Sequence, residues 1–450
     1  MNLDKKFFFK VLTITLISIS FFLGYFLREN AVGGGPEFYS MEWPIIQSLK
    51  NDFLFTINNY GLMNDYTMPF AHIMNAYLNP FSDDITNFQL SNTIISFLIF
   101  LVFAIVLKKI FSHINFLDIL LISSVFLILP FFRTSAFWGK QENYGWLFLV
   151  IAFYFFFEIK KNISKDPSNK DILNVIFFCL TSACSLYARQ ALFFLPISFL
   201  LYLFLNNANK KIIITSIISF ALFSIPGFLL MFTWGDVFHA VAGHEPWGSF
   251  LGGWINYKHI LKNLPILLSF FGFYLLPIIV IEFLNSGFRN FIHIYLKSFL
   301  FALTILFFLS QTNLLNYLGD YTLAGGAVLK VNYLIQKNNF FLLLIFSSIG
   351  FSILMRFFKE DTKNSLIIFL PIIIIYGFPK LLYQEYVEPL ILIIFFLHLK
   401  TKLHSIYFKN ISLSHFVFLS YFAIYLIGSI YFKHFAFSSF EEWKIFLKVQ

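Results

Sequence analysis

Long apolar runs recur along almost the whole chain, and they constrain the fold more than any other feature. An apolar helix of about 20 residues crosses the ~30 Å hydrocarbon core of a bilayer. The sequence therefore predicts an all-α polytopic membrane protein, a single integral membrane domain over residues 1–450 with about 13 transmembrane helices, in a range of roughly 11 to 14. The predicted spans are 7–27, 90–107, 117–132, 143–158, 172–188, 190–206, 212–233, 263–283, 294–311, 339–356, 364–379, 387–399 and 412–432.

The composition excludes an ordinary soluble domain, because 58% of the residues are hydrophobic, 12% are charged and the mean hydropathy is +0.76. Of the 32 Lys and Arg residues, 19 fall on the side of the predicted spans that holds the N-terminus and 13 on the other. Basic residues collect on the cytoplasmic side, so we expect a cytoplasmic N-terminus. This placement explains the net charge of +9 without a nucleic-acid partner. The abundance of Phe and Lys indicates AT-rich coding and favours a bacterial inner membrane.

The long hydrophilic loops fall on the opposite, extracytoplasmic side. The three largest lie at 28–89, 234–262 and 312–338. The first contains seven of the 23 acidic residues, and short amphipathic stretches such as Trp43–Leu49 predict helices that lie along the membrane interface. Carboxylates would therefore stand at the mouth of a helix bundle.

Two carboxylates of the first loop, Glu37 and Glu42, are candidates for a catalytic base, because they follow the first span directly and have apolar neighbours. The alternative is a solvated acidic loop without a chemical role. Further along, Asp65, Tyr66 and Thr67 offer one carboxylate and two hydroxyls for binding a substrate. Here the alternative is the capped start of an interfacial helix.

Polar side chains also stand at the outer ends of later spans. Arg189 and Gln190 lie between two spans with almost no loop, where the guanidinium could grip a phosphate and the amide a sugar hydroxyl. An arginine that only snorkels to the interface is the alternative. Arg133, Lys140 and Glu142 form a second polar turn on the same predicted side.

Two later segments carry further polar candidates. The loop 234–262 contains Asp236 and His239 but no zinc-binding spacing, so we predict sugar-facing polar groups there and no metal site. Glu385 and Glu388 place two carboxylates at the outer end of a late span, where helix capping is the alternative.

The order of these segments resembles that of GT-C type glycosyltransferases that use polyprenyl-phosphate sugars, and distantly that of the dolichyl-phosphate-glucose α-1,2-glucosyltransferase family. The segments that resemble motifs of the family are, in chain order, Pro36-Glu37-Phe38-Tyr39, Asp65-Tyr66-Thr67-Met68-Pro69, Leu90-Ser91-Asn92, Gln141-Glu142-Asn143-Tyr144-Gly145, Ala188-Arg189-Gln190-Ala191-Leu192, Gly235-Asp236-Val237-Phe238-His239 and Glu388-Pro389, with Tyr386 nearby.

The resemblance implies a GT-C-like fold and an inverting membrane hexosyltransferase. It would move a sugar from a polyprenyl-phosphate-linked donor to a lipid-linked glycan or another extracytoplasmic acceptor. Glu37 would be the base with Glu42 in reserve, and Arg189, helped by Lys140 or Arg133, would stabilise the departing phosphate. No metal is implied, and no cofactor beyond the polyprenyl-phosphate sugar as co-substrate. Two other classes of function stay open, namely a flippase or transporter of lipid-linked sugars and a non-catalytic membrane assembly subunit.

Overall fold

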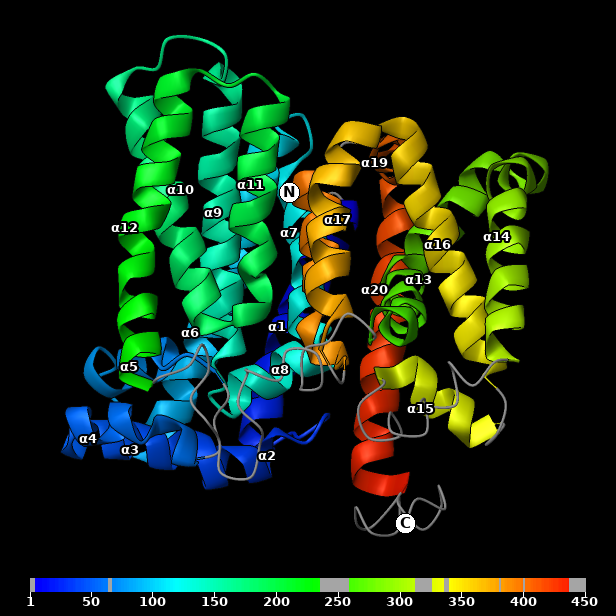
Figure 1. Cartoon of the computed structure of the whole chain (residues 1–450). Coiled ribbons are helices and arrows are strands. Elements are labelled where there is room, and N and C mark those ends of the chain that lie inside the picture. Colours follow the sequence, from blue (N-terminus) through cyan, green and yellow to red (C-terminus); the bar gives the residue numbers. More distant parts are fainter. Residues whose placement is uncertain are drawn as a thin grey trace. The chain divides into compact units, whose positions relative to one another are not determined.

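The computed structural model describes residues 5–63, 67–234, 259–311, 326–335, 340–379, 382–399 and 401–436. All the secondary-structure elements assigned within these ranges are helices, which confirms the all-helical prediction for them (Figure 1). The chain divides into two compact units, unit 1 (Met1–Ser249) and unit 2 (Phe250–Gln450), which are described separately.

Nine helices of the described residues are long and apolar enough to cross a membrane, as expected for an integral membrane protein. In unit 1 they are α1 (Lys5–Phe26), α6 (Ile85–Ile110), α9 (Glu142–Asn162), α10 (Asn169–Ala188) and α12 (Lys210–Trp234). In unit 2 they are α13 (Ile260–Ser286), α14 (Phe288–Ser310), α16 (Phe341–Glu360) and the segment Ile411–Phe435, which contains α20 (Ile411–Tyr431).

The number of spans in the described ranges rises to eleven if each of two bent helix pairs is one span. These pairs are Phe116–Ile128 with Pro130–Phe137, and Gln384–His398 with Lys402–Lys409. The two remaining predicted spans correspond to shorter apolar helices, Gln190–Leu205 and α17 (Thr362–Gly377). The total of 13 therefore stays a prediction.

The predicted span 117–132 is broken where it was expected to be continuous. Helix α7 (Phe116–Ser123) and the 3-10 helix η3 (Ser124–Ile128) meet α8 (Pro130–Phe137) at an angle of 70°. Pro130 is the first residue of α8, and Leu129 before it is extended, with ψ at 123°. A residue before proline avoids the helical region, so the break follows from the sequence at this point.

The first long loop folds into short helices that lie across one end of unit 1 (Figure 1). They are α2 (Gly34–Glu37), the π-helix η1 (Phe38–Glu42), α3 (Trp43–Asn51), α4 (Phe53–Asn58), the 3-10 helix η2 (Tyr60–Met63) and α5 (Phe70–Tyr77). Helix α3 buries Ile45, Ile46 and Leu49. Amphipathic helices were predicted here, and helices with one buried apolar face are present.

The two ends of unit 1 differ in charge. At the end away from the short helices, α6 finishes with Lys108 and Lys109, and Lys109 pairs with Glu158 of α9. At the end that carries the short helices, Trp234 is the last residue of α12, and its indole donates a hydrogen bond of 2.8 Å to the carbonyl of Ile57 in α4. The short helices are therefore tied to the bundle end opposite the basic residues.

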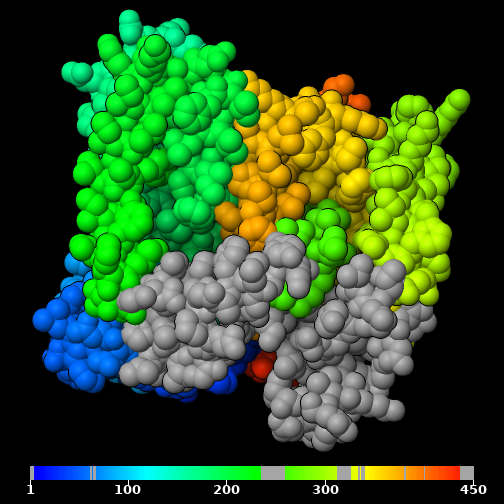
Figure 2. Space-filling view, in the orientation of Figure 1, coloured from blue at the N-terminus to red at the C-terminus, as the bar shows by residue number. Residues whose placement is uncertain are grey.

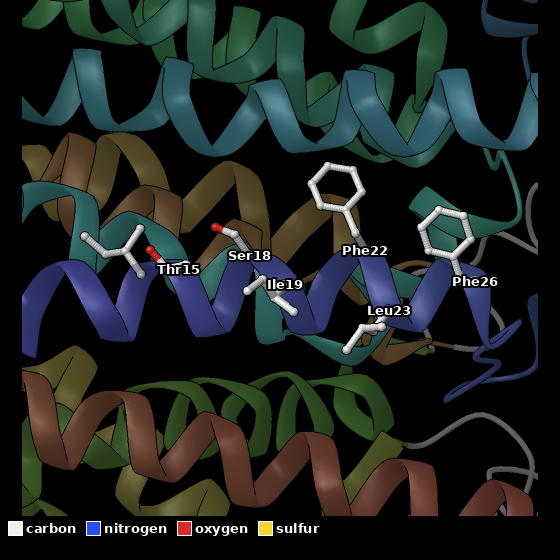
Figure 3. Close-up of a pocket in the computed structure, with 7 residues that line it drawn as sticks. Thr15, Ser18, Ile19, Phe22, Leu23 and Phe26 are labelled. Atoms are coloured by element: carbon white, nitrogen blue, oxygen red, sulfur yellow. The ribbon is translucent and has the colours of Figure 1, made fainter.

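The outer helices of unit 1 expose many apolar side chains. Figure 2 shows α12 on the surface of this unit, and its Ile218, Leu229 and Phe232 are exposed. Along α1 runs a shallow apolar pocket of about 370 Å³ (Figure 3), lined by Ile14, Thr15, Ser18, Ile19, Phe22, Leu23 and Phe26. Apolar exposure on this scale is stable where hydrocarbon, and not water, surrounds the helix.

In unit 2, α13 is the central helix and crosses α16 at backbone contact distance. A Cβ atom on Gly272 would lie 2.0 Å from the carbonyl oxygen of Phe346, and one on Gly350 would lie 1.9 Å from that of Leu268. Small residues allow such close crossings between membrane helices. Further along this pair, the guanidinium of Arg356 is hydrogen-bonded to the buried carboxylate of Glu282.

Candidate functional site

The candidate site lies in unit 1 where the turn between α8 and α9 meets the first loop. The turn contains Gly139 with φ at +61°, a left-handed conformation that favours glycine. The backbone N–H of Lys140 then donates to the carbonyl of Ser135 at 3.0 Å and ends α8. Glu142 begins α9, so the short turn between α8 and α9 contributes two charged residues, Lys140 and Glu142.

Four charged residues from three parts of the chain gather there. We call Glu37, Lys140, Glu142 and Arg189 the charged cluster. Lys140 Nζ lies 2.6 Å from Glu37 Oε2 and 3.9 Å from Glu142 Oε1. Arg189 Nη1 lies 3.3 Å from the same Glu142 oxygen. Acidic and basic groups therefore alternate through the cluster, and two cations face two carboxylates.

The end of α10 positions Arg189. This helix finishes at Ala188, and Arg189 continues with an extended backbone, φ −154° and ψ 105°. The hydroxyl of Ser185 donates to the carbonyl of Gly145 at 2.9 Å and ties α10 to α9. The guanidinium lies 5.4 Å from the ring centroid of Trp146, within the range of a cation–π contact. Gln190 begins the 3-10 helix η4 (Gln190–Phe193) directly afterwards.

Burial distinguishes the members of the charged cluster. Lys140 and Arg189 are each only 6% exposed, whereas the side chain of Glu37 is 43% exposed. A buried cation is costly unless a carboxylate or another anion lies against it. The two cations are thus buried against carboxylates, and Glu37 is the most exposed carboxylate of the charged cluster.

Glu42 lies in different surroundings from Glu37. It ends η1, is 4% exposed, and its Oε2 lies 2.5 Å from His72 Nε2. His72 Nδ1 lies 2.6 Å from the hydroxyl of Tyr60, and both rings are buried. The reserve base of the sequence analysis is therefore part of a buried polar chain.

Arg133 contacts none of the charged cluster. Its Nε and Nη2 donate to the two carboxylate oxygens of Glu29 at 2.7 and 2.5 Å, a bidentate pair. It also donates to the carbonyls of Leu127 and Ser20, each at 2.9 Å. With 1% exposure, this arginine ties α8 to the end of α1, and Lys140 is the better placed of the two proposed helpers of Arg189.

Two amides flank the charged cluster. Gln141 Nε2 donates to the hydroxyl of Thr67 at 2.5 Å, which joins the predicted first-loop segment to the α8–α9 turn. Tyr144, one turn further along α9, donates its hydroxyl hydrogen to Asn75 Oδ1 at 2.7 Å. Sequence reasoning missed Asn75, and the contact that reveals it spans 69 residues of sequence.

The late carboxylates belong to unit 2. Glu388 is 1% exposed and accepts hydrogen bonds from the hydroxyls of Tyr274 and Tyr425, the second at 3.2 Å. Gln384 donates to both hydroxyls, at 2.5 and 2.8 Å, and accepts one from the backbone of Ala327 at 2.6 Å. Glu388 is thus held in a buried polar network.

Glu385, by contrast, is half-buried and interacts electrostatically with Lys330 of α15 (Gly326–Ile335). Burial and the nearby charge of Lys433 lower the pKa of Lys330, Glu385 opposes this shift, and the net result is a pKa of about 8. Unit 2 therefore carries an amine that titrates near neutral pH.

Four of the predicted site residues, Asp65, Tyr66, Asp236 and His239, lie outside the residues that the structure describes. Within the described ranges, His, Cys, Asp and Glu side chains form no group of three that could hold a metal ion.

Comparison of the chain with family models, with curated proteins and with solved structures finds no match. The likeness to GT-C glycosyltransferases stays a prediction that rests on the motifs themselves.

Proposed function

We propose that this protein is an inverting glycosyltransferase of the GT-C type, which moves a sugar from a polyprenyl-phosphate-linked donor to a lipid-linked glycan or another extracytoplasmic acceptor. The observation that carries the proposal is the charged cluster. Three separate sequence segments were each expected to contribute to one site, and Glu37, Lys140, Glu142 and Arg189 from them lie in contact.

Glu37 would act as the general base. Inversion requires the acceptor hydroxyl to lose its proton as its oxygen attacks the anomeric carbon and the bond from that carbon to the phosphate oxygen breaks on the opposite face. The base must be reachable by the acceptor, and the 43% exposure of Glu37 meets this requirement. Glu42, hydrogen-bonded to His72 and nearly fully buried, meets it less well.

Arg189 and Lys140 would bind the phosphate of the donor and stabilise the charge that develops on it as it leaves. Cations held in place before the reaction stabilise such charge without further reorganisation. Glu142 lies between the two cations and orients both. In the free protein, Glu37 and Glu142 balance the charges of Lys140 and Arg189. When the donor binds, its phosphate would balance part of this positive charge instead.

The proposal includes a bacterial inner membrane, 13 spans, a cytoplasmic N-terminus and a site on the extracytoplasmic face. The basic ends of α6 and α9, opposite the short helices of unit 1, support this orientation. The polyprenyl-phosphate sugar is the co-substrate, with no further cofactor.

The test measures sugar transfer in detergent from synthetic polyprenyl-phosphate sugars to extracted lipid-linked or glycan acceptors. The rate of the Glu37→Gln variant is compared with that of wild type. Glutamine keeps the size of the side chain and can hydrogen-bond Lys140, but it cannot accept the acceptor's proton. We expect the rate to fall by about 10²–10⁴ with donor binding nearly intact.

Glu42→Gln is the matched control for this experiment, because it removes a carboxylate five positions away. Full transfer by Glu37→Gln and none by Glu42→Gln would reassign the base to Glu42. Full transfer by both variants would contradict the proposed function.

A further inference from the structure

Two buried amides beside the charged cluster each have one polar atom without a hydrogen-bond partner among the described residues. These atoms are Nδ2 of Asn75 and Oε1 of Gln141, and the two residues are 1% and 5% exposed. An unmade hydrogen bond on a buried polar atom destabilises the folded protein. Native structures rarely retain such atoms unless water or a ligand binds them.

The other polar atom of each amide is fixed by the structure. Asn75 Oδ1 accepts from the hydroxyl of Tyr144 at 2.7 Å, and Gln141 Nε2 donates to Thr67 Oγ1 at 2.5 Å. Asn75 Oδ1 also accepts from Asn79 Nδ2 at 3.4 Å, and in this arrangement Asn75 presents a donor and Gln141 presents an acceptor. A hydroxyl group can both donate and accept, and therefore suits both atoms.

The two amides lie around the same part of the site as Arg189. Gln141 and Tyr144 are both in the first turn of α9 or next to it, and the backbone N–H of Tyr144 donates to the carbonyl of Gln141 at 3.1 Å. The ring of Tyr144 packs with Ala188, the residue before Arg189, and with Ala71, one turn from Asn75 on α5. Amides that match hydroxyls thus stand next to cations that match a phosphate.

We propose that the amides of Asn75 and Gln141 hydrogen-bond hydroxyl groups of the donor sugar and so determine which sugar is accepted. Tyr144 is a positioning residue that holds Asn75 in the required orientation. The inference rests on the proposed function, because it assumes that the phosphate of the same donor occupies the charged cluster. A site that hydrogen-bonds a substrate hydroxyl rejects an analogue lacking that hydroxyl, since the buried groups are then left unpaired.

The test separates sugar recognition from phosphate binding. Dissociation constants are measured in detergent for bare polyprenyl phosphate and for a panel of polyprenyl-phosphate hexoses, and then for the deoxy analogues of the tightest hexose. Wild type, Asn75→Leu and Gln141→Met are compared, with Asn263→Leu as a control that removes a buried amide of unit 2, whose N–H groups donate to the carbonyls of Gly377 and Pro379 at 3.0 and 2.7 Å.

We expect each site variant to reduce the affinity gained from the sugar by roughly tenfold and to leave bare polyprenyl phosphate unaffected. In the variant that lacks the amide bound to a given sugar hydroxyl, removal of that hydroxyl from the donor should not lower the affinity further. This non-additivity is the coupling that a double-mutant cycle measures. Asn263→Leu should show no such coupling. Tyr144→Phe should weaken discrimination by a smaller factor, because Asn75 stays present but is less well oriented.

Unchanged sugar selectivity in both variants, or no gain in affinity from any hexose, would overturn the inference while leaving the phosphate site in place. A variant that fails to fold loses bare polyprenyl phosphate as well, and the other variant then decides. If Arg189→Ala binds bare polyprenyl phosphate as tightly as wild type does, the phosphate site of the proposed function fails instead.

Discussion

Glu37 and Glu42 stand five residues apart in one short segment, yet their carboxylates meet opposite environments. Glu37 ends α2 and contacts Lys140, whereas Glu42 ends the π-helix η1 and contacts His72. Sequence spacing cannot separate them, because the wider turn of a π-helix changes which face of the chain each side chain occupies. The partner on the α8–α9 turn makes Glu37 the better candidate.

Arg189 gives the sharpest test at the scale of single residues. If its guanidinium grips the donor phosphate through two charge-assisted hydrogen bonds, lysine can replace the charge but not the paired donors. We expect Arg189→Lys to impair donor use strongly in the transfer assay. Arg189→Ala should remove about 2–4 kcal/mol of transition-state stabilisation.

Arg28→Lys is the matched control for this substitution, because Arg28 also stands at the end of a span but outside the charged cluster. An arginine that only snorkels tolerates lysine almost freely. Equal transfer rates for wild type and Arg189→Lys would therefore remove the phosphate-binding role. The rate at which the donor crosses a vesicle membrane, measured with the same variants, distinguishes a transferase from a flippase.

The residues of the charged cluster could be predicted one by one from the sequence, since each is polar at the outer end of an apolar run. Their partners could not. Arg133 had the same sequence signature as Arg189, but a carboxylate 104 residues away, Glu29, occupies its guanidinium. Asn75 gave no sequence signal because an asparagine in a long hydrophilic loop is ordinary, and only its contact with Tyr144 marks it.

At the scale of helices, the positions of the apolar elements followed from the sequence, but the packing of one helix on another did not. Apolar run length predicts that a segment lies in the membrane, and proline marks where it breaks, as at Pro130. The tight crossing of α13 and α16 depends on Gly272 and Gly350, and it becomes visible only when both helices are placed. The packing of two helices on each other therefore cannot be predicted from the sequence pattern of either helix alone.

Helix α15 of unit 2 carries a prediction about pH. With a pKa of about 8, Lys330 is half neutral at pH 8, whereas a lysine at its reference value is neutral in less than about 1% of molecules. We expect Lys330 to be acetylated at pH 8 faster than the exposed Lys211, as measured by mass spectrometry after brief labelling. Because its folded pKa is below its unfolded pKa, its cost to stability is full below pH 8 and fades towards pH 10.5.

Two variants test the cause of this shift in opposite directions. Glu385→Gln removes a charge that raises the pKa of Lys330, so the labelling midpoint should move to lower pH. Lys433→Met removes a charge that lowers it, so the midpoint should move to higher pH. A midpoint near pH 10 in the unaltered protein would contradict the lowered pKa of this amine.

At the scale of the whole molecule, the membrane orientation connects the fold to the proposed site. In unit 1, helix α6 has 26 residues and rises about 39 Å, more than the ~30 Å of a hydrocarbon core. Its N-cap, Asp84, and its last basic residues, Lys108 and Lys109, therefore reach opposite membrane faces. The alternation of basic and acidic ends could be predicted from the sequence, whereas the two-unit division could not, because apolar runs do not reveal which helices pack together.

We predict that the charged cluster faces the extracytoplasmic side and the basic ends face the cytoplasm. Single cysteines at Asp83 and Lys211, whose side chains are 88% and 71% exposed, report the two ends of unit 1 in a background lacking Cys179 and Cys184. In intact cells, an impermeant maleimide should label Asp83→Cys but not Lys211→Cys, and permeabilisation should expose both. The opposite pattern would place the short helices and Glu37 in the cytoplasm, where an extracytoplasmic acceptor could not reach the base. The orientation and the site would then fail together, because the same helices that carry the basic ends also position Lys140 and Arg189.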